Sequence, residues 1–94
     1  PSIDAIFFCN DDLAQGALLA AQRLKIKVPQ QLAIAGFNDL TGSDLIGPGL
    51  TTIRTPRAAI GEAAAKMLLA LMRDDEVATP SVDVGYELMV RGST

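Results

Sequence analysis

Histidine and tryptophan are absent from this 94-residue sequence, and Cys9 is its single cysteine. The usual zinc ligand sets, the histidine-based nucleophilic triads and any disulfide within the chain are therefore excluded. The glycines between residues 36 and 49 match neither the Rossmann nor the P-loop spacing, so no phosphate-binding loop is expected. These absences predict a protein that is not an enzyme and needs no metal or cofactor. For Cys9 itself we expect a small buried residue on a strand.

Positive charge is also scarce, because eight Lys and Arg stand against eleven Asp and Glu, which gives a net charge of −3. The cations are scattered, whereas proteins that grip the phosphate backbone usually cluster them. We therefore expect that these residues alone do not bind duplex DNA at physiological salt. No stretch approaches the ~20 apolar residues that cross a bilayer, and no charged-then-apolar leader is present. The expected setting is the cytoplasm, without membrane contact.

Continuous apolar runs predict buried strands. Residues 32–35 form one such run, which stops at Gly36, and residues 4–9 contain a second. Runs of this kind are typical of strands covered on both faces, which belong to parallel sheets flanked by helices. Residues 50–54 predict a short third strand, and alternating apolar and polar residues over 82–90 predict a fourth with one buried face.

Two stretches between these strands have the apolar spacing of helices. Residues 11–25 repeat leucine and alanine at intervals of three and four, and this core-facing stripe includes Leu13 and Leu24. Thr55 and Pro56 predict the N-cap and first position of a second long helix. Its expected buried stripe consists of Ile60, Ala64, Met67, Leu68 and Leu71. The predicted fold class is α/β, a parallel-sheet fold with β-α-β-β-α-β order. Doubly buried strands need neighbours on each side, so the few strand candidates suggest a fragment of a larger sheet.

Polar side chains follow the predicted strands directly. They are Asn10, Asn38 with Asp39, and Thr55. In parallel α/β sheets ligands lie outside the carboxyl ends of the strands, so these residues are expected to meet at one edge. Amides, carboxylates and hydroxyls suit a polyol, whose hydroxyls each need a donor and an acceptor. The sequence therefore predicts a site for a small polar molecule, while Asp11 is explained as an acid in the first helical turn.

Apolar residues also occur where polar ones are expected. Leu19 interrupts the polar stripe of the first helix, next to Gln15 on the same face. The loop after Asp39 carries Leu45 and Ile46, which have no obvious place in the core. Leu19 fits either a single exposed leucine or a contact with another chain, and the loop either folds back on the core or docks on another chain. We expect a homodimer that uses Gln15, Leu19, Leu45 and Ile46.

Four segments, in order and at the expected spacings, together resemble the C-terminal part of LacI/GalR-family transcriptional repressors. They are CNDDLAQGA at 9–17, VP at 28–29 with LAIAGFND at 32–39, LTTIRTPR at 50–57 with IG at 60–61, and ELMVR at 87–91. The resemblance covers essentially the whole chain.

This resemblance implies part of a two-lobed effector domain of the periplasmic-binding-protein type. Residues 1–54 would lie mainly in the C-terminal lobe and residues 55–90 would cross to the other lobe. The helix-turn-helix headpiece that binds operator DNA is absent from these residues. Asn10 and Asn38 match family positions that contact effector, although Asn38 stands where the family most often has Asp. An amide donates as well as accepts, which favours a sugar acid such as gluconate over a neutral sugar.

Two alternatives share some of these features. A periplasmic sugar-binding protein of a transporter has the same fold, and a leader peptide in place of a helix-turn-helix would identify it. An aspartyl-phosphate receiver is suggested only by Asp11 and Asp12 after a strand. The further aspartate and the lysine that a receiver needs are not at the expected places.

Overall fold

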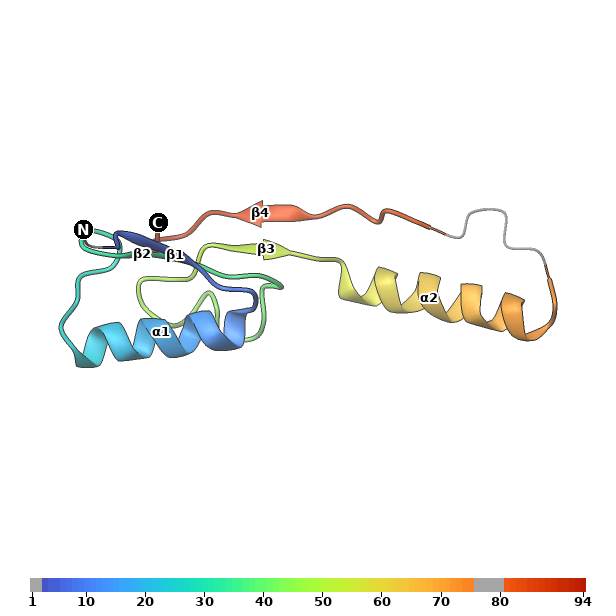
Figure 1. Cartoon of the computed structure of the whole chain (residues 1–94), viewed down its shortest axis with the longest axis horizontal. Helices are drawn as coiled ribbons and strands as arrows, with labels where there is room; N and C mark the ends of the chain where they lie inside the picture. Colours follow the sequence, from blue (N-terminus) through green and yellow to red (C-terminus); the bar gives the residue numbers. More distant parts are fainter. Residues whose placement is uncertain (1–2, 76–80) are drawn as a thin grey trace. The chain divides into compact units, whose positions relative to one another are not determined.

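The computed structural model describes residues 3–75 and 81–94, and it divides the chain into two compact units. The first unit is Pro1–Arg54 with Glu87–Thr94, and the second is Thr55–Tyr86. Along the chain the elements are β1 (Ala5–Phe7), α1 (Asp11–Arg23), β2 (Ala33–Ala35), β3 (Thr52–Arg54), α2 (Arg57–Met72) and β4 (Glu87–Met89) (Figure 1). The α/β class and the β-α-β-β-α-β order are confirmed.

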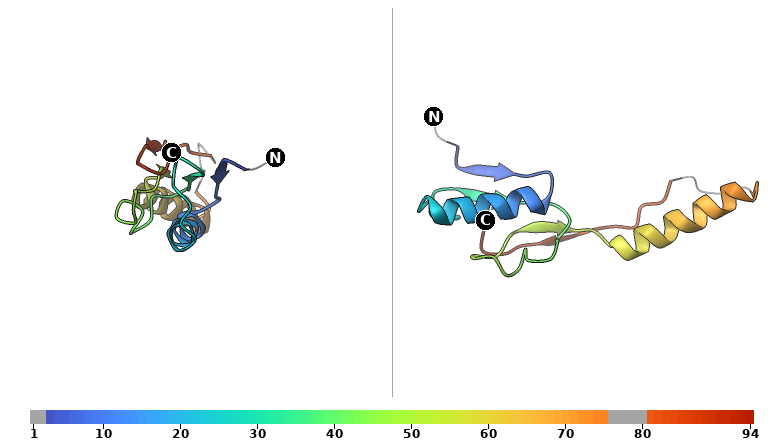
Figure 2. Two further views of the ribbon diagram at one scale, coloured as in Figure 1. Left: turned by 90° about the vertical axis from the view of Figure 1, so that its left-hand side faces the viewer. Right: turned by 90° about the horizontal axis from the view of Figure 1, so that it is seen from below.

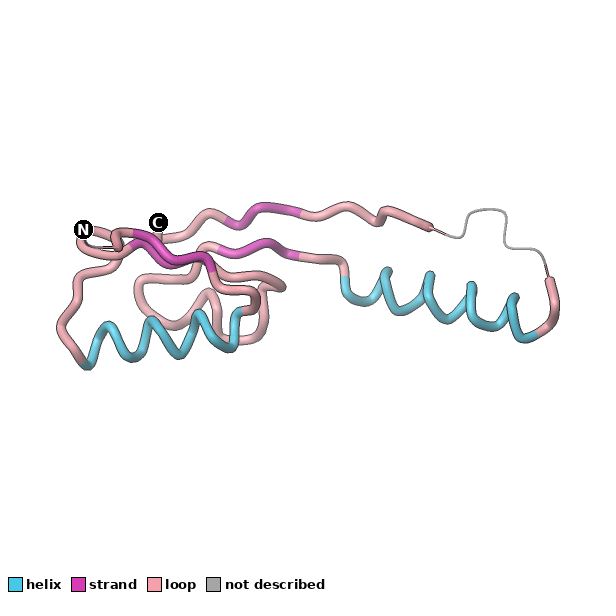
Figure 3. The backbone as a smooth tube through the Cα atoms, viewed as in Figure 1, coloured by secondary structure: helices cyan, strands magenta, loops and turns pink. Residues whose placement is uncertain are grey.

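The strands of the first unit form two pairs, β1 with β2 and β3 with β4. β1 and β2 are parallel, with Ala5 opposite Ala33, and β3 and β4 are antiparallel. Figure 3 shows β3 and β4 side by side. A parallel bridge between Ala35 and Thr51 joins the two pairs, and the Gly36 N–H donates to the Thr51 carbonyl at 2.9 Å. β1 and β2 are connected through α1 and lie next to each other, as is usual for parallel strands joined by one helix.

Helix α1 covers this sheet on one side (Figure 2). It begins where the Asn10 side chain accepts the Leu13 N–H at 2.9 Å, as an N-cap should, and it ends before Lys25, whose φ is +59°. Its buried face supplies Ala14 and Leu18 to the core. The buried apolar cluster consists of Ala14, Leu18, Ile34 and Leu50.

Gly36 lets β2 pass this core closely. A Cβ atom there would lie 3.1 Å from both the Ala14 Cβ and the Leu50 Cδ2, and it would also collide with the Asp11 carboxylate. A side chain larger than hydrogen is therefore excluded without a shift of α1 or of the strand. The glycine that ends the apolar run in the sequence is thus needed for packing.

Several expectations about burial were wrong. Cys9 is exposed and lies beyond β1, and Phe7 in β1 is exposed as well. The reason is that β1 pairs only with β2 among the described residues, and α1 covers one face of the pair. Leu13 and Leu24, which were expected in the buried stripe of α1, are exposed too.

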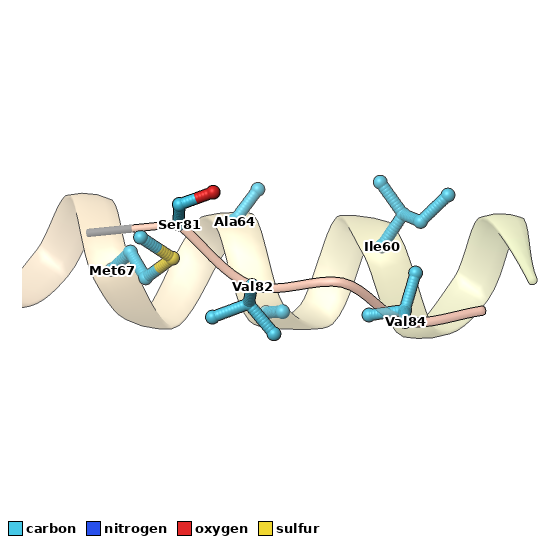
Figure 4. A pocket seen from close by; sticks show the side chains of 7 residues that line it. Ile60, Ala64, Met67, Ser81, Val82 and Val84 are labelled. Atoms are coloured by element: carbon cyan, nitrogen blue, oxygen red, sulfur yellow. The ribbon is translucent and has the colours of Figure 1, made fainter. Parts of the chain in front are cut away.

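The second unit is a single helix with a short extended segment beside it. Ile60, Ala64 and Met67 of α2 line a shallow apolar groove together with Val82 and Val84 (Figure 4). No residue of α2 is buried, so the expected buried stripe, which included Leu68 and Leu71, is wrong for this unit. One extended segment cannot cover the apolar face of a 16-residue helix.

The ends of these elements also differ from the expectation. Pro56 is the N-cap of α2 and its side chain cannot accept a hydrogen bond, so Thr55 is not the cap that the sequence predicted. The predicted strand over 82–90 is reduced to β4, because β3 offers only three residues as partners. Among the described residues no helix has the length and apolar character to cross a membrane.

Candidate functional site

Two polar segments leave the same edge of the first unit. Asn10 follows β1 by three residues and Asn38 follows β2 by three, and the two strands are parallel neighbours. The backbone joins the segments directly, because the Asp11 N–H donates to the Phe37 carbonyl at 3.1 Å. The structure therefore brings Asn10 and Asn38 to one rim, which we call the strand-end rim and define as residues 10–11 and 37–43.

Asn38 and Asp39 have an unusual backbone conformation. Their φ angles are +106° and +54°, in the region that residues other than glycine seldom adopt. The Asn38 N–H donates to the Ile53 carbonyl at 2.8 Å, and the Asp39 N–H donates to the Thr52 hydroxyl at 3.3 Å. Asn and Asp tolerate this region better than most residues, and such conformations concentrate at functional sites.

The Asp39 carboxylate is held by two arginines. Its Oδ2 lies 2.7 Å from the Arg54 Nε, and its Oδ1 lies 2.8 Å from the Arg91 Nη1. The Asp39 side chain is only 9% exposed, whereas that of Arg54 is 49% exposed. The Arg91 guanidinium also donates to the Leu50 carbonyl at 2.9 Å. Asp39 was predicted to contact the effector, and the structure shows its negative charge already balanced within the chain.

These ion pairs shift the ionisation of the carboxylate. The hydrogen bond from Arg91, followed by that from Arg54 and the charges of both, lowers the pKa of Asp39 below its ordinary value, against the opposing effect of burial. The hydrogen bond and charge of Asp39 in turn raise the pKa of Arg54. The charged form of Asp39 is therefore the one that the fold stabilises.

A pH dependence of stability follows from the pKa of Asp39. Because its folded pKa is depressed, the contribution of Asp39 is fully present above its unfolded value of about 3.8 and is lost as the pH falls through the folded value. We expect the wild type to be more stable than Asp39→Asn at about pH 6, with a difference that shrinks below about pH 4. Urea denaturation at a series of pH values measures the difference in unfolding free energy between the two proteins. A difference that does not change with pH would contradict the prediction.

Asp11 forms the centre of a buried hydrogen-bond network at the same rim. Its Oδ1 accepts from the Thr52 hydroxyl at 2.6 Å, and its Oδ2 accepts from the Leu40 N–H at 2.8 Å and from the Ser43 hydroxyl. Asp11 has no exposed surface. Its position in the first turn of α1 was predicted, but its burial and its three partners were not.

The predicted dimer residues lie on α1 and on the loop that is bonded to it. The Gln15 Nε2 donates to the Thr41 carbonyl at 3.1 Å and to the Ser43 hydroxyl at 2.9 Å, which ties the loop to α1. Leu19 and Leu45 are exposed, as expected. Ile46 is only partly exposed and packs against the core cluster, so the view that it has no place in the core was wrong.

Thr55 is the first residue of the second unit, and its contact with effector stays a prediction. The chain division between Arg54 and Thr55 lies where the sequence predicted a crossing between lobes, while residues 87–94 belong to the first unit. The assignment of either unit to a lobe stays a prediction. Within residues 3–75 and 81–94, no group of three or more Cys, Asp or Glu side chains is placed to hold a metal ion.

Comparison with known proteins identifies relatives over the full chain. The family model of the periplasmic binding protein-like domain matches residues 1–94. The HTH-type transcriptional regulator GntR of Pseudomonas aeruginosa is 60% identical over 94 residues, which are 100% of this chain and 27% of that protein. The chain thus spans about a quarter of the length of this curated relative.

Solved structures agree with this result. The transcription regulator GntR of Chromobacterium violaceum is 54% identical with a TM-score of 0.84, over 96% of this chain and 33% of that one. A periplasmic binding protein/LacI transcriptional regulator of Alkaliphilus metalliredigens, complexed with D-xylulofuranose, is 27% identical with a TM-score of 0.85, over 97% and 34%. These relatives are transcriptional regulators rather than enzymes, in agreement with the sequence-based prediction.

Proposed function

The chain belongs to the periplasmic binding protein-like domain family and is part of a LacI-type transcriptional regulator, and we propose that its strand-end rim senses a sugar or sugar acid. The observation that carries this proposal is the 60% identity to a GntR regulator over the whole chain. The rim supports it, because polar side chains gather where α/β sheets bind ligands. One relative binds D-xylulofuranose, and we extend a ligand of that class to this chain.

The charges at the rim favour a sugar acid over a neutral sugar. Asn38 is a neutral amide, Asp39 is balanced by Arg54 and Arg91, and Asp11 is buried among three donors. The rim therefore offers hydrogen-bond donors without an unbalanced negative charge that would repel a carboxylate. D-gluconate is the probe that we propose for this site.

The rest of the regulator completes the function. Effector bound between two lobes would control operator binding by a helix-turn-helix outside these residues, and Thr55 is proposed as a further effector contact. The regulator would act in the cytoplasm as a homodimer. The surface formed by Gln15, Leu19, Leu45 and Ile46, which we call the α1–loop surface, would form the contact between the two copies. A two-fold dimer presents this surface from both copies.

Titration calorimetry of the intact regulator with D-gluconate and D-glucose tests this proposal. We expect D-gluconate to bind and Asn38→Asp to weaken it by about tenfold or more, because two negative charges within about 4 Å repel by 1–4 kcal/mol near a protein surface. Asp12→Asn, which changes an exposed acid outside the rim contacts, is the matched control and should leave the affinity unchanged. Binding of D-glucose alone would contradict the sugar-acid assignment, and binding of neither compound nor of any related sugar would contradict the sensing role.

A further inference from the structure

The backbone on both sides of Asn38 is held by Asp11. The Asp11 N–H donates to the Phe37 carbonyl at 3.1 Å, before Asn38, and the Asp11 Oδ2 accepts from the Leu40 N–H at 2.8 Å, after it. One residue of α1 thus holds the backbone at Phe37, before Asn38, and at Leu40, after Asp39. A segment held at both ends has little freedom to change its backbone angles.

Thr52 closes the same arrangement from β3. Its hydroxyl donates to the Asp11 Oδ1 at 2.6 Å and accepts from the Asp39 N–H at 3.3 Å. Thr52 is 1% exposed and Asp11 is 0% exposed, so these bonds are shielded from water. Shielded bonds to a carboxylate are stronger than exposed ones, and leaving such a group without donors is costly.

The hydrogen bonds that Asp11 and Thr52 make to residues 37–40, which we call the clamp, explain how Asn38 and Asp39 keep positive φ angles. Asn38 and Asp39 have backbone φ angles of +106° and +54°, and neither residue is a glycine. An unrestrained chain seldom adopts such angles at residues with side chains. Such backbone angles persist only where surrounding contacts impose them. Here Asp11 bonds the backbone before and after the segment and Thr52 bonds the Asp39 N–H within it, in addition to the bond from the Asn38 N–H to the Ile53 carbonyl. Gly36 lets the chain pass close to Asp11.

We propose that Asp11 and Thr52 are positioning residues for effector recognition: they set the backbone of Asn38 and thereby the direction of its side chain, without contacting effector themselves. This inference rests on the proposed sensing role of the rim. A carboxylate is needed at position 11 because Oδ1 and Oδ2 together accept three hydrogen bonds from Thr52, Leu40 and Ser43. An amide has one acceptor oxygen, so whichever way it is turned its NH2 group replaces the acceptor of at least one of these three bonds.

The test uses the intact regulator and two readouts. Amide hydrogen exchange is expected to show faster exchange of the Leu40 and Asp39 N–H groups in Asp11→Asn, with no change in the exposed neighbour variant Asp12→Asn. Titration with D-gluconate, well below the unfolding temperature, is expected to show about tenfold or weaker binding for Asp11→Asn. Thr52→Val should also speed amide exchange and weaken D-gluconate binding. Thr52→Ser, which keeps the hydroxyl, should retain most of the affinity.

Each outcome separates this inference from the proposed function. If Asp11→Asn lowers the unfolding temperature but its folded form binds D-gluconate as the wild type does, Asp11 is merely structural and the proposal is overturned. Unchanged exchange at Leu40 and Asp39 would overturn it as well. If the wild type binds no sugar acid or sugar while the exchange still responds to Asp11, the sensing role fails and the clamp is a structural feature only. Should Asp11→Asn fail to fold, the pair Thr52→Val and Thr52→Ser decides.

Discussion

A variant with Arg91 replaced by methionine is expected to lose about 2–3 kcal/mol of unfolding free energy. The Arg91 guanidinium bonds both the Asp39 carboxylate and the buried Leu50 carbonyl, at 2.8 Å and 2.9 Å. Its loss leaves a carboxylate that is 9% exposed, with the ion pair to Arg54 still in place. A largely buried charge that loses a partner keeps the cost of its burial, so the effect exceeds the value of an ordinary surface ion pair.

Urea denaturation of the intact regulator, followed by circular dichroism, measures this loss. Arg54→Met is the matched control, because it removes the other arginine of the same carboxylate. The Arg54 side chain is 49% exposed, so solvent already screens its charge and a smaller loss is expected. Adding Asp39→Asn to Arg91→Met should recover part of the stability, since a neutral amide needs no cation. Equal losses in the two arginine variants would show that burial does not decide the strength of these ion pairs.

Local features of the sequence predicted the order and type of the elements well. Asn10 follows an apolar run and precedes the periodic stripe of α1, and the helix begins directly after it because capping depends on neighbours along the chain. Gly36 marks the end of β2 in the same local way. Burial was predicted less well: Phe7 and Leu68 are apolar, but an apolar residue says nothing about which element covers it.

The site was predicted only as far as topology reaches. Adjacent parallel strands bring Asn10 and Asn38 to one edge, and this follows from chain order alone. The partners that give the rim its electrostatics are remote in sequence: Arg91 lies 52 positions from Asp39, and Thr52 lies 41 positions from Asp11. No periodicity encodes such pairs. From the sequence, an acid in a first helical turn is explained by its favourable interaction with the helix dipole. Only the structure shows which donors surround it.

Replacing Leu19 by glutamate is expected to weaken the proposed dimer by about a thousandfold. Leu19 is 53% exposed on α1, beside the loop that carries the 80% exposed Leu45. Burying one leucine contributes on the order of 2 kcal/mol per chain at about 25 cal/mol per Å². A two-fold interface buries it twice, so about 4 kcal/mol of association free energy is lost. Sedimentation velocity of the intact regulator over a concentration series measures the change, while circular dichroism checks that the helix content is retained.

Leu13 supplies the control for this dimer prediction. It lies on the same helix, it is also 53% exposed, and its direction from the helix axis is about 120° from that of Leu19. Leu13→Glu therefore adds the same charge to α1 and removes the same apolar side chain, but outside the α1–loop surface. We expect Leu13→Glu to dimerise like the wild type, because only a residue buried between the two copies changes their affinity. Equal dimerisation of Leu19→Glu and the wild type would show that this face of α1 does not join the copies, and equal weakening by both variants would show that charge on α1, rather than the α1–loop surface, controls association.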